Sequence, residues 1–143
     1  MPVRKSEAVW EGDLMNGKGT MKVGSGAFEG AYSFKSRFEE GVGTNPEELI
    51  AAAHAGCFSM AFSAFLTEAG YKPERIHTVA RVHLDKVGDG FGITAIDLVT
   101  EGKVPGISKD AFVQQAEVAK NNCPVSQVLV GAEIRLKEVK LID

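Results

Sequence analysis

The sequence predicts a protein of the α+β class, in which antiparallel strands and separate helices are combined. Three observations support this fold class. Short segments of alternating polar and apolar residues, separated by turn residues, fill most of residues 4–38, and such segments are typical of antiparallel strands. A long uncharged segment follows, and two more alternating segments precede a second helical region. Strands and helices therefore do not alternate one by one, as they do in a doubly wound fold.

Three short strands are expected near the N-terminus, over residues 4–11, 20–23 and 31–38. Asn16-Gly17 is a strong turn signal between the first two strands, and Gly24-Ser25-Gly26 is a turn candidate before the third. This pattern predicts an antiparallel meander.

The central segment is predicted to be a long helix. Asn45, Pro46 and Glu48 are typical of the N-cap, N1 and N3 positions and predict a capping box. No charged residue occurs between Leu49 and Leu66. An uncharged stretch of this length raises the question of a membrane span, but it is rich in alanine, glycine and serine and lacks flanking basic residues. We therefore expect a central helix covered on all sides by protein.

The second half of the chain is predicted to contain a ribbon of two long strands, two helices and a last strand. Ser108 is suited to cap the first of these helices, and Pro124 to start the second, shorter one. The expected ranges are 75–87 and 91–103 for the ribbon, 108–122 and 125–130 for the helices, and 132–141 for the strand.

Length and charge favour one domain over residues 1–143, with neither nucleic acid nor a membrane as partner. A chain of 143 residues can bury a sizeable core. The net charge of −3 gives no electrostatic reason to expect nucleic acid. Residues 1–7 lack the apolar segment of a signal peptide, so we expect a cytoplasmic location.

The two cysteines, Cys57 and Cys123, both fall on apolar sides of predicted helices. In one interpretation they are small core residues without chemistry. In the other, packing of the helices brings the two sulfurs together as a redox pair. One thiolate would then attack the O–O bond of a peroxide and form a sulfenic acid, and the second thiol would close a disulfide.

An attacking thiol must be ionised, which requires a nearby cation or a helix N-terminus. Arg37, on the expected strand over 31–38, is the nearest basic candidate for Cys57, and Glu47 or Glu48 could hold its guanidinium. Glu47 and Cys57 are ten residues apart, or about 15 Å along a helix. Because one arginine cannot contact both within one chain, this activation implies a second subunit and a symmetric dimer.

Two features of the sequence point in other directions. Cys123 directly precedes the helix that starts at Pro124, so the helix dipole alone favours Cys123 as the attacking thiol. His54 lies one turn before Cys57, which is the spacing of half a metal site, but the sequence offers no second half. A buried, hydrogen-bonded histidine is the alternative for His54.

Most aromatic residues near these positions are expected in the core, while a few could line an apolar entrance suited to an alkyl hydroperoxide. This set, with one methionine, is Phe34, Phe38, Phe58, Met60, Phe62 and Phe65.

Several motifs resemble the family of osmotically inducible protein C, and together they extend over nearly the whole chain. The two cysteine motifs, Ala-Ala-His-Ala-Gly-Cys around Cys57 and Cys-Pro-Val-Ser-Gln from Cys123, are more similar to this branch than to the organic hydroperoxide resistance branch. The matching segments are 43–61, 122–129, Trp10-Glu11-Gly12-Asp13, Lys18-Gly19-Thr20 and Leu84-Asp85-Lys86-Val87.

The resemblance implies a thiol-dependent peroxidase in which Cys57 attacks the peroxide and Cys123 resolves the sulfenic acid. Arg37 and Glu47 match the activating arginine and its carboxylate partner. The implied fold is an intertwined homodimer, with antiparallel sheets around long central helices and two sites at the subunit interface.

The resemblance also implies organic hydroperoxides as preferred substrates, hydrogen peroxide as a poorer one, and a dithiol or lipoyl-type reductant. No metal, haem or flavin cofactor is implied. The alternative functions are a non-catalytic dimer that binds a hydrophobic ligand and a metal-binding dimer, both with thiols as bystanders.

Overall fold

The computed structural model describes residues 1–143 in full. The chain forms two compact units, Met1–Leu49 and Ile50–Asp143, and the long helix α2 begins in the first and continues in the second. The predicted α+β class is confirmed, because two three-stranded sheets occur together with four helices. The single domain expected over residues 1–143 stays a prediction.

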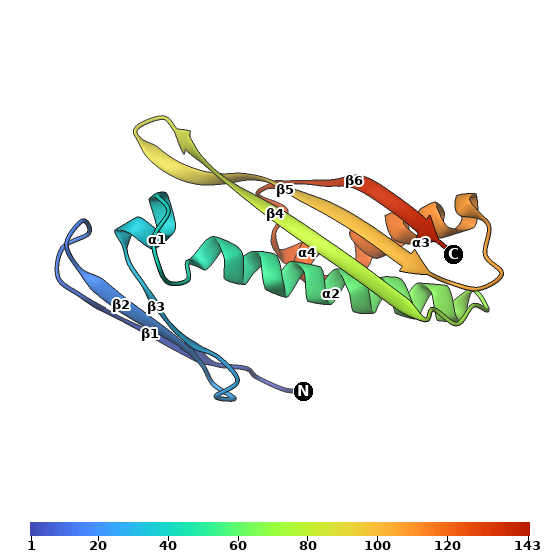
Figure 1. The fold of residues 1–143 in the computed structure, drawn as a ribbon, viewed down its shortest axis with the longest axis horizontal. Coiled ribbons are helices and arrows are strands. Elements are labelled where there is room, and N and C mark those ends of the chain that lie inside the picture. The colour runs from blue at the N-terminus through green and yellow to red at the C-terminus, as the bar shows by residue number, and fades with distance from the viewer. The chain divides into compact units, whose positions relative to one another are not determined.

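The first unit contains an antiparallel meander with the strand order β1-β2-β3 (Figure 1). The predicted turn between β1 and β2 is present, with the N–H of Gly17 donating to the carbonyl of Asp13 at 2.9 Å. The rings of Trp10 and Tyr32 pack together with centroids 5.3 Å apart. The strands of this sheet are β1 (Ser6–Glu11), β2 (Lys18–Val23) and β3 (Glu29–Tyr32).

The expected strand over residues 31–38 is wrong in its second part, because helix α1 occupies Phe34–Phe38. Ser33 caps this helix: its hydroxyl accepts the N–H of Ser36 at 3.2 Å, and the Ser36 hydroxyl accepts the N–H of Ser33 at 2.8 Å. This reciprocal pair is a capping box with serine in place of the usual glutamate. A five-residue segment is too short for alternation to distinguish a strand from a helix. Arg37 therefore lies on a helix.

Helix α2 (Pro46–Glu68) begins where the sequence predicts. The Asn45 side chain accepts the N–H of Glu48 at 2.7 Å, as an N-cap should. The Glu48 carboxylate accepts the hydroxyl of Thr44 at 2.6 Å, which differs from the expected capping box. Gly43 makes the turn into this helix with φ +122°, and a Cβ there would lie 2.6 Å from the Ala31 carbonyl oxygen.

The second unit contains a sheet with the strand order β4-β5-β6. Figure 1 shows β4 and β5 as a long two-stranded ribbon that runs along α2. The β5–β6 pair is parallel, so the expectation of antiparallel sheets is wrong for this pair of strands. The two helices between β5 and β6 form the crossover that a parallel pair requires. The elements are β4 (Arg75–Val87), β5 (Gly90–Lys103), α3 (Lys109–Asn122), α4 (Pro124–Val128) and β6 (Glu133–Ile142).

The core of this unit lies between α2, β5 and α3. Phe62 is fully buried and contacts two aromatic rings, Phe58 at 5.6 Å and Phe112 at 4.9 Å between centroids. The other fully buried apolar residues of this cluster are Leu66, Ile96, Leu98, Ala116, Ala119 and Cys123. Cys123 thus lies in the same core as the aromatic cluster.

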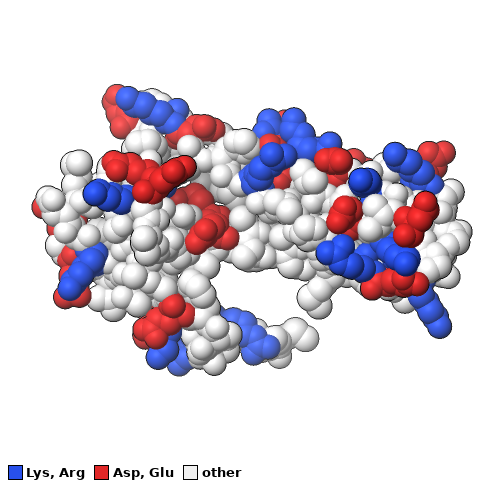
Figure 2. Space-filling view, in the orientation of Figure 1, with Lys and Arg blue, Asp and Glu red and all other residues white.

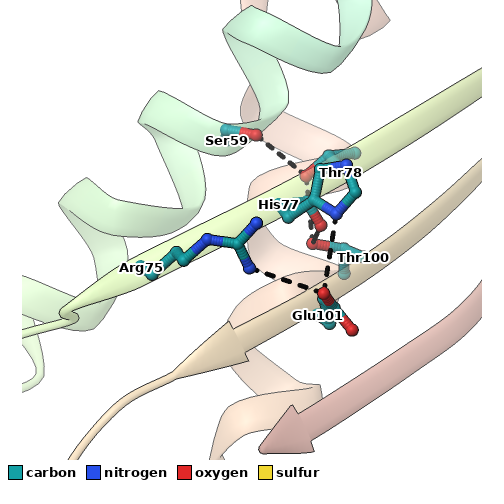
Figure 3. Close-up of polar contacts among 6 residues, drawn as sticks. All are labelled: Ser59, Arg75, His77, Thr78, Thr100 and Glu101. Atoms are coloured by element: carbon teal, nitrogen blue, oxygen red, sulfur yellow. Dashed lines mark hydrogen bonds and ion pairs between the residues drawn. The ribbon is translucent and has the colours of Figure 1, made fainter.

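A chain of hydroxyl groups fixes α2 against the ribbon (Figure 3). Ser59 donates to Thr78 on β4 at 2.8 Å, and Thr78 contacts Thr100 on β5 at 3.0 Å. These hydrogen bonds link α2 through Thr78 to the second strand of the ribbon.

One side of α2 is not covered within the chain, although the sequence predicts coverage all round. Met60 is 76% exposed, and the exposed residues around it are small. By length and composition alone α2 could cross a membrane, and only 22% of its most apolar window is buried in the chain. The exposed stripe consists of Ala52, Ala53, Gly56, Met60 and Ala64.

Asp97 is the most buried charged residue of the second sheet. Its neighbours in β5, Ile96 and Leu98, are in the core, so Asp97 points to the opposite face. It accepts hydrogen bonds from Arg135 Nε at 2.5 Å and pairs with His83 Nε2 at 2.7 Å. These partners lower the pKa of Asp97 to about 2. Elsewhere on the visible surface, basic and acidic side chains are interspersed (Figure 2).

Candidate active site

Arg37 and Glu47 form a two-pronged ion pair at the start of α2. Arg37 Nε donates to Glu47 Oε1 and a terminal guanidinium nitrogen donates to Oε2, both at 3.1 Å. This geometry fixes the plane of the guanidinium. The Glu47 side chain is 9% exposed and that of Arg37 is 37% exposed. The carboxylate is thus a buried anchor that leaves the outer edge of the guanidinium open.

The backbone around this pair is fixed by buried hydrogen bonds between α1 and the start of α2. Ser36 donates to the carbonyl of Thr44 at 2.7 Å, and the Asn45 amide donates to the carbonyl of Ser36 at 3.0 Å. Two hydrogen bonds therefore hold Ser36, next to Arg37, against the residues that lead into α2 and Glu47.

A cavity of about 210 Å³ lies beside Arg37 in the first unit. Phe38 packs under the guanidinium, with 5.2 Å from Arg37 Cζ to the ring centroid. The cavity combines an apolar wall with a cation, an arrangement that suits an organic group with a polar end. Its lining is Trp10, Leu14, Tyr32, Ser33, Phe34, Arg37 and Phe38.

This cavity is lined by Phe34 and Phe38, two of the residues that the sequence suggests for an apolar entrance. Trp10 and Tyr32 reach it from the meander and are not among those candidates. Phe58 and Phe62 are instead fully buried in the core of the second unit.

The two cysteine sulfurs contact each other in the second unit. Cys123 Sγ lies 2.8 Å from Cys57 Sγ, and both thiols are free. Cys57 lies in the middle of α2 and is half-buried, whereas Cys123 is fully buried between α3 and α4. A sulfenic acid on Cys57 would have a second thiol within reach.

Burial raises the pKa of the Cys57 thiol, and the contact with the Cys123 sulfur raises it further. A hydrogen bond from the backbone N–H of Val125 acts in the opposite direction. Val125 belongs to the first turn of α4, so the helix start that the sequence associates with Cys123 also donates to Cys57. No basic side chain contributes to the change in the Cys57 pKa.

His54 is buried one turn before Cys57 and contacts Ser126 on α4, with 2.6 Å between His54 Nε2 and Ser126 Oγ. Its Nδ1 has no hydrogen-bond partner. Burial lowers the pKa of His54, so the ring is neutral at pH 7. No group of three or more histidine, cysteine or acidic side chains in residues 1–143 is arranged so that it could hold a metal ion.

The structure thus brings the predicted site residues together as two pairs. Arg37 lies against Glu47 in the first unit, and Cys57 lies against Cys123 in the second. The sequence did not predict the contacts of Val125 with Cys57 and of Ser126 with His54. The spacing of these residues is the signal that could have indicated the contacts. His54 and Cys57 are three residues apart on α2, and Cys123 and Ser126 are three residues apart at the start of α4.

Comparisons with known proteins identify the family to which the chain belongs. Residues 39–139 match the family described as OsmC-like protein. The chain is 54% identical over 134 residues to peroxiredoxin OsmC of Escherichia coli strain K12, and the match covers 93% of each protein. It is 33% identical over 92 residues to the organic hydroperoxide resistance protein of Xanthomonas axonopodis pv. citri strain 306, covering 64% of this chain and 63% of that protein.

Solved structures show the same fold. The organic hydroperoxide resistance protein of Elizabethkingia anophelis superposes with a TM-score of 0.74 at 23% identity, over 99% of both chains. The organic hydroperoxide resistance protein OhrB of Bacillus subtilis does so with a TM-score of 0.71 at 22% identity, over 96% of this chain and 98% of that one. By its matching family description and its 54% identity to a curated relative, the chain belongs to the OsmC-like family.

Proposed function

We propose that this protein is a thiol-dependent peroxidase that reduces organic hydroperoxides to alcohols. The observation that carries the proposal is the contact between a half-buried Cys57 and a fully buried Cys123. The more accessible sulfur is suited to meet a substrate, and the buried one is suited to close a disulfide. The relative at 54% identity is named a peroxiredoxin.

The reaction has two steps with balanced chemistry. The Cys57 thiolate attacks the distal oxygen of ROOH, the O–O bond breaks, and the RO⁻ that leaves takes up a proton to give ROH. The resulting Cys57 sulfenic acid then reacts with the Cys123 thiol, forming the S–S bond and releasing water. An external dithiol, such as a lipoyl group, reduces the disulfide and becomes a cyclic disulfide itself.

Arg37 and Glu47 are the residues that we propose to activate Cys57. A buried thiol without a cation ionises poorly, because burial raises its pKa. A guanidinium would favour the thiolate and stabilise the negative charge that develops on the leaving oxygen. Glu47 holds the guanidinium in one plane through both oxygens, which would orient its free edge toward the reacting atoms.

The protein would act as a homodimer in which Arg37 activates Cys57 of the partner subunit. Glu47 and Cys57 lie ten residues apart on one helix, and about 15 Å of helix exceeds what one arginine can bridge. The exposed apolar stripe around Met60 supports this proposal, because a second copy would cover it. The intertwined arrangement of the dimer is part of the same proposal.

The preference for organic hydroperoxides over hydrogen peroxide is supported by the apolar cavity beside Arg37. An alkyl or aryl group would gain from burial there, whereas hydrogen peroxide has no such group. The chemistry needs no metal, haem or flavin, since sulfur carries the electrons. A cytoplasmic location, where dithiol reductants are maintained, stays a prediction.

The test is the consumption of cumene hydroperoxide with dihydrolipoamide as reductant. Cys57→Ser should lower kcat/KM by at least about 1,000-fold, since it removes the nucleophile. Cys123→Ser should permit one turnover and then stop, with a sulfenic or sulfinic acid on Cys57 in the mass spectrum. Equal rates for Cys57→Ser and wild type would contradict the proposal. A protein that only binds a hydrophobic ligand would consume no peroxide, and its affinity would survive both substitutions.

A further inference from the structure

Helix α4 contacts one turn of α2 at three polar points. Two of them involve Cys57, which meets the Cys123 sulfur and the backbone N–H of Val125. The third is the hydrogen bond at 2.6 Å between His54 and Ser126, both of which are buried. The His54–Ser126 contact lies one helical turn from the sulfur pair on α2.

Stability alone does not explain a histidine at this position. Nδ1 of His54 has neither a hydrogen-bond partner nor solvent, and a buried polar atom in this state is unfavourable. An apolar side chain of similar size, opposite an alanine at 126, would fill the same volume without an unsatisfied atom. The His54–Ser126 contact therefore calls for an explanation other than packing.

We propose that the His54–Ser126 hydrogen bond is a positioning device that keeps Cys123 in register with Cys57 while Cys57 is oxidised. This inference rests on the proposed peroxidase function. Cys57 and Cys123 remain the reacting groups, and His54 and Ser126 act through them. Their role is to let the Cys57 sulfenic acid react with Cys123 to form the disulfide before a second peroxide molecule oxidises it.

The chemistry of the cycle shows why such a device is needed. A sulfenic acid places an oxygen on the Cys57 sulfur, so the contact with Cys123 and the hydrogen bond from Val125 both change at that moment. The His54–Ser126 bond contains no sulfur and persists through this step. Val125 and Leu129 also attach α4 to the core, but apolar contacts permit small rotations that a short hydrogen bond does not.

The step that the device assists is balanced. The Cys123 sulfur displaces hydroxide from the Cys57 sulfenic acid, the S–S bond forms as the S–O bond breaks, and the thiol proton leaves with the hydroxide as water. No further oxidant takes part.

The first measurement is the equilibrium between the dithiol and the Cys57–Cys123 disulfide in glutathione redox buffers, with no peroxide present. Ser126→Ala should lower the effective concentration of the two thiols by about tenfold. The matched control is Ser59→Ala, which removes a 2.8 Å hydroxyl hydrogen bond from the same helix, but one directed to β4 (Figure 3). The control should leave the equilibrium within about twofold of wild type.

The double variant His54→Leu/Ser126→Ala separates positioning from stability. Because both polar partners are removed together, its free energy of unfolding should equal or exceed that of wild type. Its disulfide should nevertheless form with an effective concentration about tenfold lower. A double variant that closes the disulfide as readily as wild type would overturn the inference.

Two amides at position 54 provide a rescue test. Glutamine places its amide near the position of His54 Nε2 and should restore the hydrogen bond to Ser126. Asparagine has the same chemistry but reaches only to Nδ1, and it should behave like Ser126→Ala. Equal closure in His54→Gln and His54→Asn would count against the device.

Sensitivity to over-oxidation links the device to catalysis. At raised cumene hydroperoxide, Ser126→Ala should accumulate Cys57 sulfinic acid several-fold faster than wild type and Ser59→Ala. Equal accumulation would overturn the inference. Failure of the wild type to consume peroxide would contradict the proposed function instead, and the glutathione equilibrium would still report on the His54–Ser126 pair.

Discussion

The start and the middle of helix α2 are built in opposite ways. At the start, Arg37 and Glu47 form a charged pair that is open on one edge and fixed by buried backbone contacts. In the middle, Cys57 meets Cys123 in an apolar setting, and no basic group lowers the pKa of Cys57. One region has a cation without a nucleophile, and the other has a nucleophile without a cation.

This difference indicates how the two regions would be used. A thiol that is half-buried among apolar groups has a raised pKa and is protected from unwanted oxidation. We expect it to become reactive when a guanidinium is brought to it. A second subunit is the source that the helix geometry favours, and assembly of the dimer would then complete the site.

The largest change is expected from Arg37→Ala. If Arg37 stabilises the Cys57 thiolate and the developing oxyanion, kcat/KM for cumene hydroperoxide should fall by about 100-fold. Lys35→Ala is the matched control, because Lys35 is a basic residue on the same short helix and is exposed. Equal losses in the two variants would mean that any positive charge on this helix has the same effect as Arg37. The contrast between the two regions of α2 would then not hold.

The pH dependence of thiol alkylation sharpens the same comparison. Burial raises the pKa of Cys57, and a guanidinium should lower it again. In Arg37→Ala the thiolate form should therefore appear only at higher pH, and the iodoacetamide rate at pH 7 should be about tenfold lower than in wild type. Glu47→Gln should shift the profile in the same direction by less. Superimposable profiles would contradict activation by Arg37.

The smallest effect on catalysis is expected from the charged cluster around Asp97. Asp97→Asn should lower the free energy of unfolding at pH 7 by about 1–2 kcal/mol and leave kcat/KM unchanged. Because the pKa of Asp97 is lowered to about 2, its contribution is present above about pH 4 and is lost as the pH falls toward 2. Urea unfolding at several pH values measures this, and a difference from wild type that stays undiminished between pH 4 and pH 2 would contradict it.

The elements that sequence could predict are those with several agreeing local signals. The start of α2 combines a cap, a proline and an uncharged run, and its observed first residue is Pro46 as predicted. The ribbon strand Arg75–Val87 has clear alternation over 13 residues and was also predicted with its observed bounds. Long periodic segments leave little room for an alternative structure.

The elements that sequence missed depend on contacts distant along the chain or on very short segments. Helix α1 has only five residues and is defined by the reciprocal bonds of Ser33 and Ser36. The parallel pairing of β6 with β5 depends on how the crossover helices pack, which local pattern does not encode. The sulfur contact could be anticipated because both cysteines lie on apolar helix faces. The His54–Ser126 bond joins two polar residues 72 positions apart, and no local pattern pairs them.

Purified heterodimers with one substitution in each chain address the shared site. In a dimer of an Arg37→Ala chain and a Cys57→Ser chain, activation across the interface leaves one intact site and about half of the wild-type kcat per dimer. A reference dimer, with both substitutions in one chain and a wild-type partner, should be nearly inactive. The reverse result, an inactive mixed dimer and a half-active reference dimer, would show that Arg37 and Cys57 act within one chain and would contradict the proposed division of the site.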